Sequence, residues 1–163
     1  MYQYKITLLK SKISEEDVKF RCSQDVAENS FIQSLFTASD NDKEKLYVII
    51  LNIKNKIIGY SLVSMGSLTA SIVHPREVLK PAILASAASI IIIHNHPSGD
   101  PEPSTDDIEI TNRISRASSI MGINLLDHII LGFDADEFKR LPQSSLIISQ
   151  RSLFPSILNK VQY

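Results

Sequence analysis

The strongest constraint on the fold is an apolar run, Ala87 to Ile93, that leads directly into a His-Asn-His-Pro sequence. Its length and its richness in β-branched isoleucine are typical of a buried strand. We therefore expect His94 and His96 at the end of this strand. Because successive side chains of a strand alternate between its two faces, residues two apart project from the same face and can bind one metal ion.

A third candidate ligand, Asp107, follows His96 by eleven residues. The loop between them is rich in proline and glycine, which favours a turn that brings the carboxylate back toward the strand. Two imidazole nitrogens and one carboxylate oxygen leave a coordination position for water, the arrangement of catalytic rather than structural zinc. The same ligand types also fit the facial triad of non-haem iron oxygenases, so residue chemistry alone leaves the metal open.

These residues also have an ordinary structural interpretation. A His-x-His pair at a strand end often only hydrogen-bonds to the backbone. Ser104 and Asp107 have the spacing of a helix N-cap and its reciprocal partner, at the start of a predicted helix from Ser104 to Met121. Since a carboxylate is favoured in the first turn of a helix and keeps a free oxygen there, capping and metal binding do not exclude each other.

The His-x-His-Pro sequence, with Ser eight and Asp eleven residues after the second His, resembles the JAMM motif of the JAB/MPN metallopeptidases. Three strings, Val73–Glu77, His94–Ser104 and Leu126–Ile130, resemble the bacterial RadC-like branch of that family. The resemblance covers residues 43–132. It implies an α/β domain of α+β type with a cytidine-deaminase-like, JAB/MPN architecture: a mixed, largely antiparallel sheet flanked by helices.

The resemblance also implies a site. His94, His96 and Asp107 match the family's ligands of one zinc ion per chain. Ser104 matches the serine that steadies the developing oxyanion, and Glu44 matches a glutamate from an upstream strand that acts as the general base.

The identity of the general base is open at this stage. Glu44 stands just before the predicted strand Leu46–Leu51, but its charged neighbours also fit an ordinary solvated surface. Glu77 is the rival, in a Pro-Arg-Glu segment typical of a first helical turn, where an acidic residue is expected anyway. Glu102 and Glu109 lie close to the metal loop but match no role in the family.

Three more polar residues have two interpretations each. His74 and His128 belong to family-like strings, and either could lie behind a metal ligand or make a structural hydrogen bond; we favour the structural role. Asp127 could orient a ligand histidine, as carboxylates do around zinc, although a strand-edge or turn aspartate is the commoner case.

The predicted ligands indicate a hydrolase. Zinc lowers the pKa of its bound water from about 15.7 to about 7, so a carboxylate such as Glu44 can take the proton and let hydroxide attack an amide carbonyl. We predict a zinc metallopeptidase or isopeptidase that acts on a peptide or protein conjugate. Two alternatives stay open: a RadC-type accessory protein in DNA metabolism, after the family's historical label, and a non-catalytic MPN scaffold. Scaffold versions typically lose metal ligands, whereas all three persist here.

The composition of the sequence also indicates which partners and which cellular compartment to expect. The net charge of -1, without a basic patch interleaved with aromatic residues, disfavours nucleic acid as a partner. A single cysteine, Cys22, excludes an intrachain disulfide and fits a reducing cytosol. No apolar run reaches the roughly 18 residues needed to cross a bilayer. We therefore expect a cytoplasmic protein without membrane contact.

We expect three segments: residues 1–40, part of the same domain; the metal-binding core, 41–132; and an unassigned segment, 133–163. The first segment contains a strand, Tyr4–Leu9, whose exposed edge could pair with a second copy in a homo-oligomer, and a helix from Ser14 through Leu35. The other predicted elements, in chain order, are a charged linker Thr37–Lys45, a hairpin of Leu46–Leu51 and Ile57–Ser64, a short strand Ser67–Val73, a helix Pro75–Ser86 and a closing strand Asn124–Leu131.

Overall fold

The computed structural model describes residues 29–36, 43–66, 73–132 and 138–140. The predicted strand Tyr4–Leu9, the short strand over 67–72 and most of the first helix lie outside these residues, and the segment boundaries at 40 and 132 stay predictions. The helices are α2 (Ser30–Ser34), α3 (Pro75–Leu84) and α4 (Thr105–Ile120). The strands are β1 (Glu44–Leu51), β2 (Ile57–Gly66), β3 (Ser89–Asn95), β4 (Asn124–Leu131) and β5 (Phe138–Arg140).

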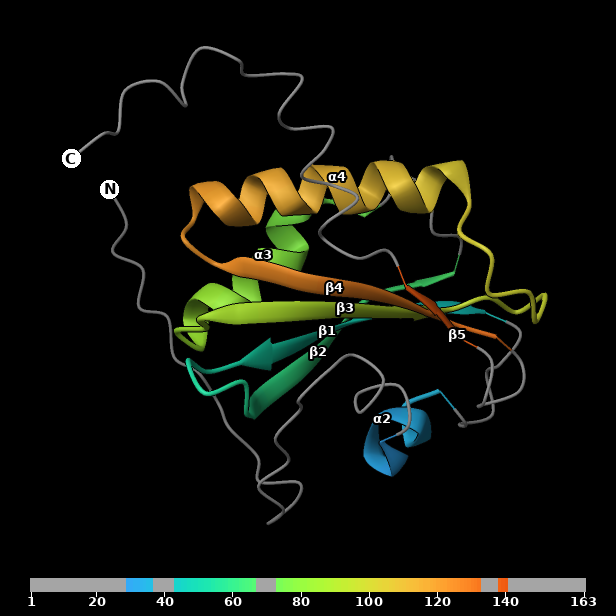
Figure 1. Ribbon diagram of the computed structural model, residues 1–163, viewed down its shortest axis with the longest axis horizontal. Helices are drawn as coiled ribbons and strands as arrows, with labels where there is room; N and C mark the ends of the chain where they lie inside the picture. Colours follow the sequence, from blue (N-terminus) through green and yellow to red (C-terminus); the bar gives the residue numbers. More distant parts are fainter. Residues whose placement is uncertain (1–28, 37–42, 67–72, 133–137, 141–163) are drawn as a thin grey trace, which may run out of the picture.

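The strands form one mixed sheet in the order β2-β1-β3-β4-β5. β1 pairs antiparallel with both β2 and β3, and β4 pairs antiparallel with β5. Among the strands in the described residues, only β3 and β4 pair in parallel, and α4 connects them. The predicted α/β class with a mixed, largely antiparallel sheet is therefore confirmed, as is the hairpin of β1 and β2 (Figure 1).

Helices cover both faces of this sheet. α3 and α4 lie on one face and α2 lies on the other (Figure 1). The isoleucines of β3 divide between the two cores: Ile90 and Ile92 pack beneath α3 and α4, whereas Ile91 and Ile93 pack on the α2 side. A strand that is buried on both faces needs no polar alternation, which explains the uninterrupted apolar run in the sequence.

Two of the predicted elements were wrong in extent. The charged linker Thr37–Lys45 was predicted too long, because Glu44 and Lys45 belong to β1 and pair with Gly66 and Met65 of β2. Paired backbone groups on a sheet outweigh the low strand propensity of charged residues.

The helix predicted from Ser14 through Leu35 does not run through Asn29. Asn29 has an extended backbone, and its side chain accepts hydrogen bonds from the backbone N–H groups of Phe31 and Ile32, so α2 begins at Ser30. Among the helices in the described part of the chain, none is long and apolar enough to cross a bilayer.

Candidate metal centre

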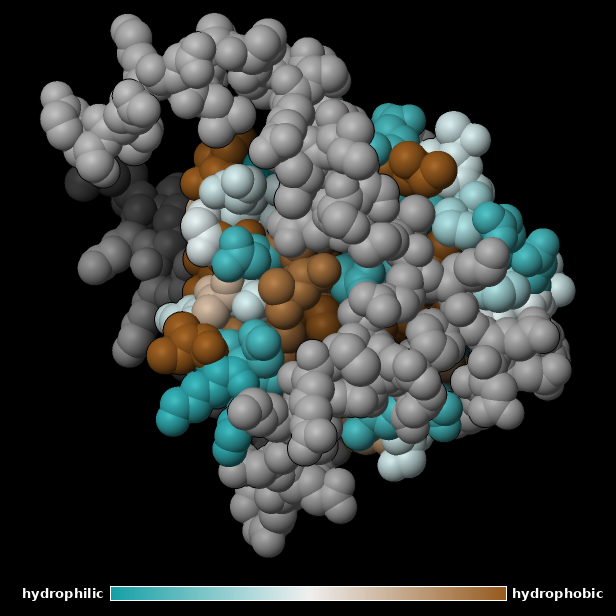
Figure 2. Space-filling view, in the orientation of Figure 1, coloured by the Kyte–Doolittle hydropathy of each residue, from teal (hydrophilic) through white to brown (hydrophobic). Residues whose placement is uncertain are grey.

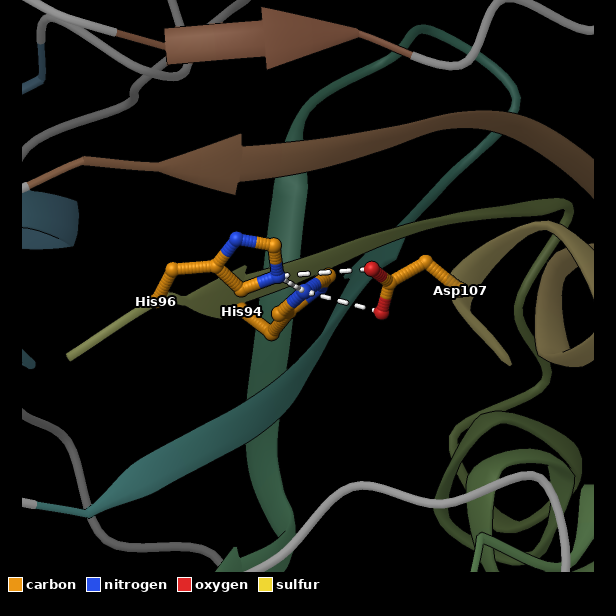
Figure 3. Close-up of side chains that lie close together, drawn as sticks. All are labelled: His94, His96 and Asp107. Atoms are coloured by element: carbon orange, nitrogen blue, oxygen red, sulfur yellow. Dashed lines mark hydrogen bonds and ion pairs between the residues drawn. The ribbon is translucent and has the colours of Figure 1, made fainter. Parts of the chain in front are cut away.

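Three potential metal ligands meet where β3 ends and α4 begins. His94 is in β3 and His96 directly follows its last residue, while Asp107 lies in the first turn of α4 with its carboxylate toward both rings (Figure 3). The Nε2 atoms of His94 and His96 lie 2.9 Å apart. Asp107 Oδ1 lies 3.1 Å from Nε2 of His94, and Oδ2 lies 3.3 Å from Nε2 of His96. The structure therefore brings together all three residues that the sequence predicts as ligands, positioned to bind one metal ion.

Asp107 is both a helix cap and a ligand candidate. Its Oδ2 accepts hydrogen bonds from the backbone N–H of Ser104 at 2.7 Å and from the Ser104 hydroxyl at 2.5 Å. In return, the Asp107 N–H donates to the Ser104 hydroxyl oxygen at 3.1 Å. This is the capping box that the S-x-x-D spacing predicts, and it holds the carboxylate in place without using Oδ1.

The Asp107 carboxylate is held in its ionised form. Burial alone would raise the pKa of this group, but the hydrogen bond and charge of His94 when that ring is protonated, together with the hydrogen bonds from Ser104, outweigh burial and hold the pKa well below its usual range. The carboxylate is 4% exposed, so a buried anion faces the two imidazoles. A buried anion of this kind favours a cation beside it.

The orientation of His96 is fixed by the loop that follows β3. The Nδ1–H of His96 donates to the backbone carbonyl of Asp100 at 2.7 Å. Because a carbonyl oxygen only accepts, the proton of a neutral ring is on Nδ1 and the lone pair is on Nε2. Gly99, at φ 84°, makes the turn that returns Asp100 to His96. Figure 2 shows hydrophilic residues along the right-hand edge, where Figure 1 places this loop.

The chemistry of the donor set fits a metal ion. Nε2 of His96 and both oxygens of Asp107 are acceptors, and Nε2 of His94 faces them. Each imidazole uses its other nitrogen elsewhere, which is the usual arrangement for histidines that bind metals through Nε2. Acceptors that converge so closely need a shared cation or protons between them. Two nitrogens and a carboxylate suit zinc or another divalent transition metal.

Behind His94 lies His128, for which the sequence allowed a place behind a metal ligand but favoured a purely structural hydrogen bond. His94 Nδ1 is 2.8 Å from Nε2 of His128, and His128 Nδ1 is 2.5 Å from the hydroxyl of Thr111. Burial, and then the neighbouring His94, hold the pKa of His128 well below its usual value, despite an opposing effect of Asp107. His128 is fully buried, and its contact with His94 gives it a place directly behind the metal site.

A shift in strand pairing places His128 there. Between Ile90 and Ile91 the pairing of β3 with β4 slips by one residue, which leaves Leu126 without a partner. After the slip His128 lies on the sheet face that carries the candidate ligands, and Asp127 lies on the opposite face. Oδ1 of Asp127 accepts the backbone N–H of His128 at 2.9 Å. His128, rather than Asp127, therefore contacts a candidate ligand histidine.

The two candidates for the general base occupy different environments. Glu44 begins β1 two residues before Leu46, which pairs with His94 of β3, and the N–H of Lys45 donates to Oδ1 of Asn95 at 2.8 Å, so the start of β1 lies beside the end of β3. Glu77, by contrast, accepts hydrogen bonds from Lys80 Nζ at 2.6 Å and Arg76 Nε at 3.2 Å in the first turn of α3. Its pKa is lowered, first by the hydrogen bond from Lys80.

His74 caps α3 through its backbone position alone, is exposed, and is not among the residues that converge on the centre. This placement agrees with the structural role favoured for it.

Comparison with known proteins identifies the domain. The family model described as the RadC-like JAB domain matches residues 20–139. The chain belongs to the RadC-like JAB domain family. The resemblance noticed over 43–132 is thus confirmed, and the match extends beyond it at both ends. Domains of the JAB type are usually hydrolytic.

The relatives are longer proteins whose names state no activity. A UPF0758 protein of Desulforamulus reducens is 44% identical over 134 residues, 82% of this chain and 56% of that protein. One of Clostridium beijerinckii is 46% identical over 138 residues, 83% of this chain and 57% of the relative. One of Caldanaerobacter subterraneus is 59% identical over 90 residues, 55% of this chain and 39% of the relative. The chain therefore spans about half the length, or less, of the curated relatives it matches.

Proposed function

We propose that this domain is a zinc-dependent metallopeptidase or isopeptidase that hydrolyses an amide bond with an activated water. The observation that carries the proposal is the convergence of His94, His96 and Asp107 at one end of the sheet, inside a RadC-like JAB domain. Histidine nitrogens and one carboxylate are the ligands of hydrolytic zinc sites such as those with two histidines and a glutamate.

Zinc held by these three residues would supply an open position for water and lower the pKa of that water to about 7. The residues of the chain prepare this chemistry. The carbonyl of Asp100 holds His96 with its Nε2 lone pair toward the centre, and the capping box holds the Asp107 carboxylate there. The ligands are therefore oriented before any ion binds, which reduces the ordering cost of binding.

Glu44 is the proposed general base. Glu44 lies two residues before Leu46, the partner of His94 in β3, so regular alternation along β1 would put its side chain on the sheet face that carries His94. A carboxylate there would accept the proton of the attacking water and return it to the leaving amine. Glu77 is the weaker candidate, because its carboxylate is engaged by Lys80 and Arg76 at the surface.

Ser104 is proposed to stabilise the tetrahedral oxygen of the substrate. Its hydroxyl donates to Asp107 Oδ2, so the hydroxyl must rotate toward the substrate for this role. A donor of this kind typically lowers the barrier by about 3 kcal/mol. Until substrate arrives, the same hydroxyl supports the capping box that holds Asp107.

The proposed substrate is a peptide or protein conjugate. We place the reaction in the cytoplasm and propose that the whole protein forms a homo-oligomer. The net charge of -1 gives no general attraction to nucleic acid, which argues against the accessory role in DNA metabolism. The complete ligand set argues against a non-catalytic scaffold.

The test is hydrolysis by the full chain loaded with zinc, measured on fluorogenic peptides and on a lysine-linked isopeptide. Glu44→Gln should keep the metal and lose at least about a hundredfold in rate, because general-base catalysis typically contributes about 10²–10⁴-fold. His96→Ala should lose both metal and hydrolysis. Wild-type activity in Glu44→Gln would remove Glu44 from the mechanism, and zinc-loaded wild-type protein that cleaves neither substrate class would contradict the peptidase proposal.

A further inference from the structure

A chain of buried polar groups runs from the metal centre into the protein and back. His94 Nδ1 lies 2.8 Å from His128 Nε2, and His128 Nδ1 lies 2.5 Å from the Thr111 hydroxyl. That hydroxyl lies 2.5 Å from the backbone carbonyl of Asp107. The chain therefore starts at one candidate ligand, His94, and ends on the backbone of another, Asp107. His94, His128 and Thr111 are at most 1% exposed, so water does not compete for these hydrogen bonds.

The donor and acceptor of each hydrogen bond can be assigned by starting from the Asp107 carbonyl and working back to His94. The Asp107 carbonyl can only accept, so the Thr111 hydroxyl gives its one proton to this carbonyl. The Thr111 oxygen must then accept from His128, which places the His128 proton on Nδ1. A neutral His128 with its proton on Nδ1 has a lone pair on Nε2, and this lone pair can only accept from His94. The proton of a neutral His94 is thus on Nδ1, and its lone pair is on Nε2, the nitrogen that faces Asp107 and His96.

We propose that Thr111 and His128 are positioning residues that fix the tautomer of His94 so that its Nε2 lone pair points to the metal. The inference rests on the metal site of the proposed function and adds two residues to it. Neither residue touches the metal. His96 obtains the same tautomer from a backbone carbonyl, that of Asp100, whereas His94, deep in the strand, obtains it from a side-chain relay.

In this relay, the Thr111 hydroxyl controls the tautomer of His94 without contacting it. His128 lies between them, and its own tautomer decides which nitrogen of His94 keeps a lone pair. If the hydroxyl is absent, nothing holds the His128 proton on Nδ1, and a proton on Nε2 would force His94 to accept through Nδ1. His94 would then carry its own proton on Nε2, where the metal should bind.

Two substitutions of Thr111 separate this role from packing. Thr111→Val keeps the shape and volume of the buried side chain but removes the hydroxyl. Thr111→Ser keeps the hydroxyl but removes a buried methyl group, which costs packing energy. A purely structural role predicts that the serine variant is as impaired as the valine variant or more so. The relay predicts the opposite order for metal affinity.

The measurement is zinc affinity of the full chain by competition with a chromophoric chelator. Thr111→Val should bind zinc about tenfold to a hundredfold more weakly, the usual effect of losing a group that orients a metal ligand. Thr111→Ser should bind near the wild-type affinity. His128→Leu should bind zinc at least as weakly as Thr111→Val. Leu125→Ala, which creates a cavity in the core beneath α3 and α4 but away from the ligands, should keep its zinc affinity while losing stability. Equal affinities of the two Thr111 variants would overturn the relay.

A second readout does not need metal. Ring-nitrogen chemical shifts of His128 in the metal-free chain should show the proton on Nδ1 in the wild type and in Thr111→Ser, and a shift of population to Nε2 in Thr111→Val. A wild-type His128 protonated on Nε2 would overturn the relay even if zinc binds. If the wild type binds no zinc but His128 carries its proton on Nδ1, the metal site fails while the hydrogen-bond relay stands.

Discussion

Asp107→Ala tests whether one carboxylate serves both the helix and the metal. The substitution removes the hydrogen bonds that Oδ2 accepts from the Ser104 backbone N–H and hydroxyl. The loss of a cap of this kind typically costs about 1 kcal/mol of stability. It also removes the only carboxylate among the three converging ligands in the described part of the chain, so zinc should no longer stabilise the fold.

The stability gained from zinc binding should be larger than the stability that the capping hydrogen bonds contribute. For a wild type saturated at a free zinc concentration one hundred times Kd, binding adds about 2.7 kcal/mol of stability. At about 2–4 °C per kcal/mol for a chain of this size, zinc should raise the wild-type Tm by roughly 5–11 °C. Asp107→Ala should lower the metal-free Tm by only about 2–4 °C, the equivalent of one cap, and should show no rise with zinc.

Ser104→Ala is the matched control, measured by thermal unfolding with circular dichroism before and after chelator treatment. It loses the hydroxyl of the same capping box but keeps all three ligands. Its metal-free Tm should therefore fall by a similar amount, while its rise with zinc persists. A zinc-dependent rise of wild-type size in Asp107→Ala would refute the assignment of this carboxylate as a ligand.

Three further predictions concern the base, the loop and nucleic acid. Glu77→Gln should keep the wild-type rate of hydrolysis and change stability little, because its ion pairs with Lys80 and Arg76 are exposed to solvent. A rate as low as that of Glu44→Gln would make Glu77 the base. Gly99→Ala puts a side chain at φ 84°, which costs roughly 1–2 kcal/mol and should displace the Asp100 carbonyl from His96. The zinc affinity, measured by chelator competition, should therefore fall. Unchanged affinity would show that this carbonyl does not orient His96. Binding of the chain to duplex DNA should be undetectable by fluorescence anisotropy at physiological salt, given its net charge of -1; tight binding that weakens steeply with salt would revive the accessory role.

The ligand set could be predicted from sequence because it depends on local rules. The His-x-His spacing on a strand puts both rings on one face, and the S-x-x-D spacing puts Asp107 in the first turn of α4. Asp107 can both cap α4 and bind a metal because its carboxylate has two oxygens: Oδ2 accepts the Ser104 N–H, and Oδ1 faces His94. For the same local reason, the boundaries of α3 and α4 were predicted to within a few residues.

The relay behind His94 could not be predicted, because it depends on the register between two strands. Regular alternation along β4 would put His128 on the face opposite to Leu125, but the observed slip at Leu126 puts both on the same face. Thr111 carries no motif at all: its position one helical turn after Asp107 matters only once β4 brings His128 against it. The position of Glu44 near the end of β3 is likewise set by the pairing of β1 with β3, a contact between segments some fifty residues apart.

The central claim is that His94, His96 and Asp107 bind zinc, and elemental analysis tests it most directly. The full chain is purified without chelator and without added metal, beside His94→Ala, which removes one ligand and leaves the capping box of α4 intact. We predict close to one zinc per chain in the wild type and a loss of most of it in the variant. Equal metal content in the two proteins, or none in the wild type even after equilibration with zinc, would contradict the claim and leave a capped helix beside two structural histidines.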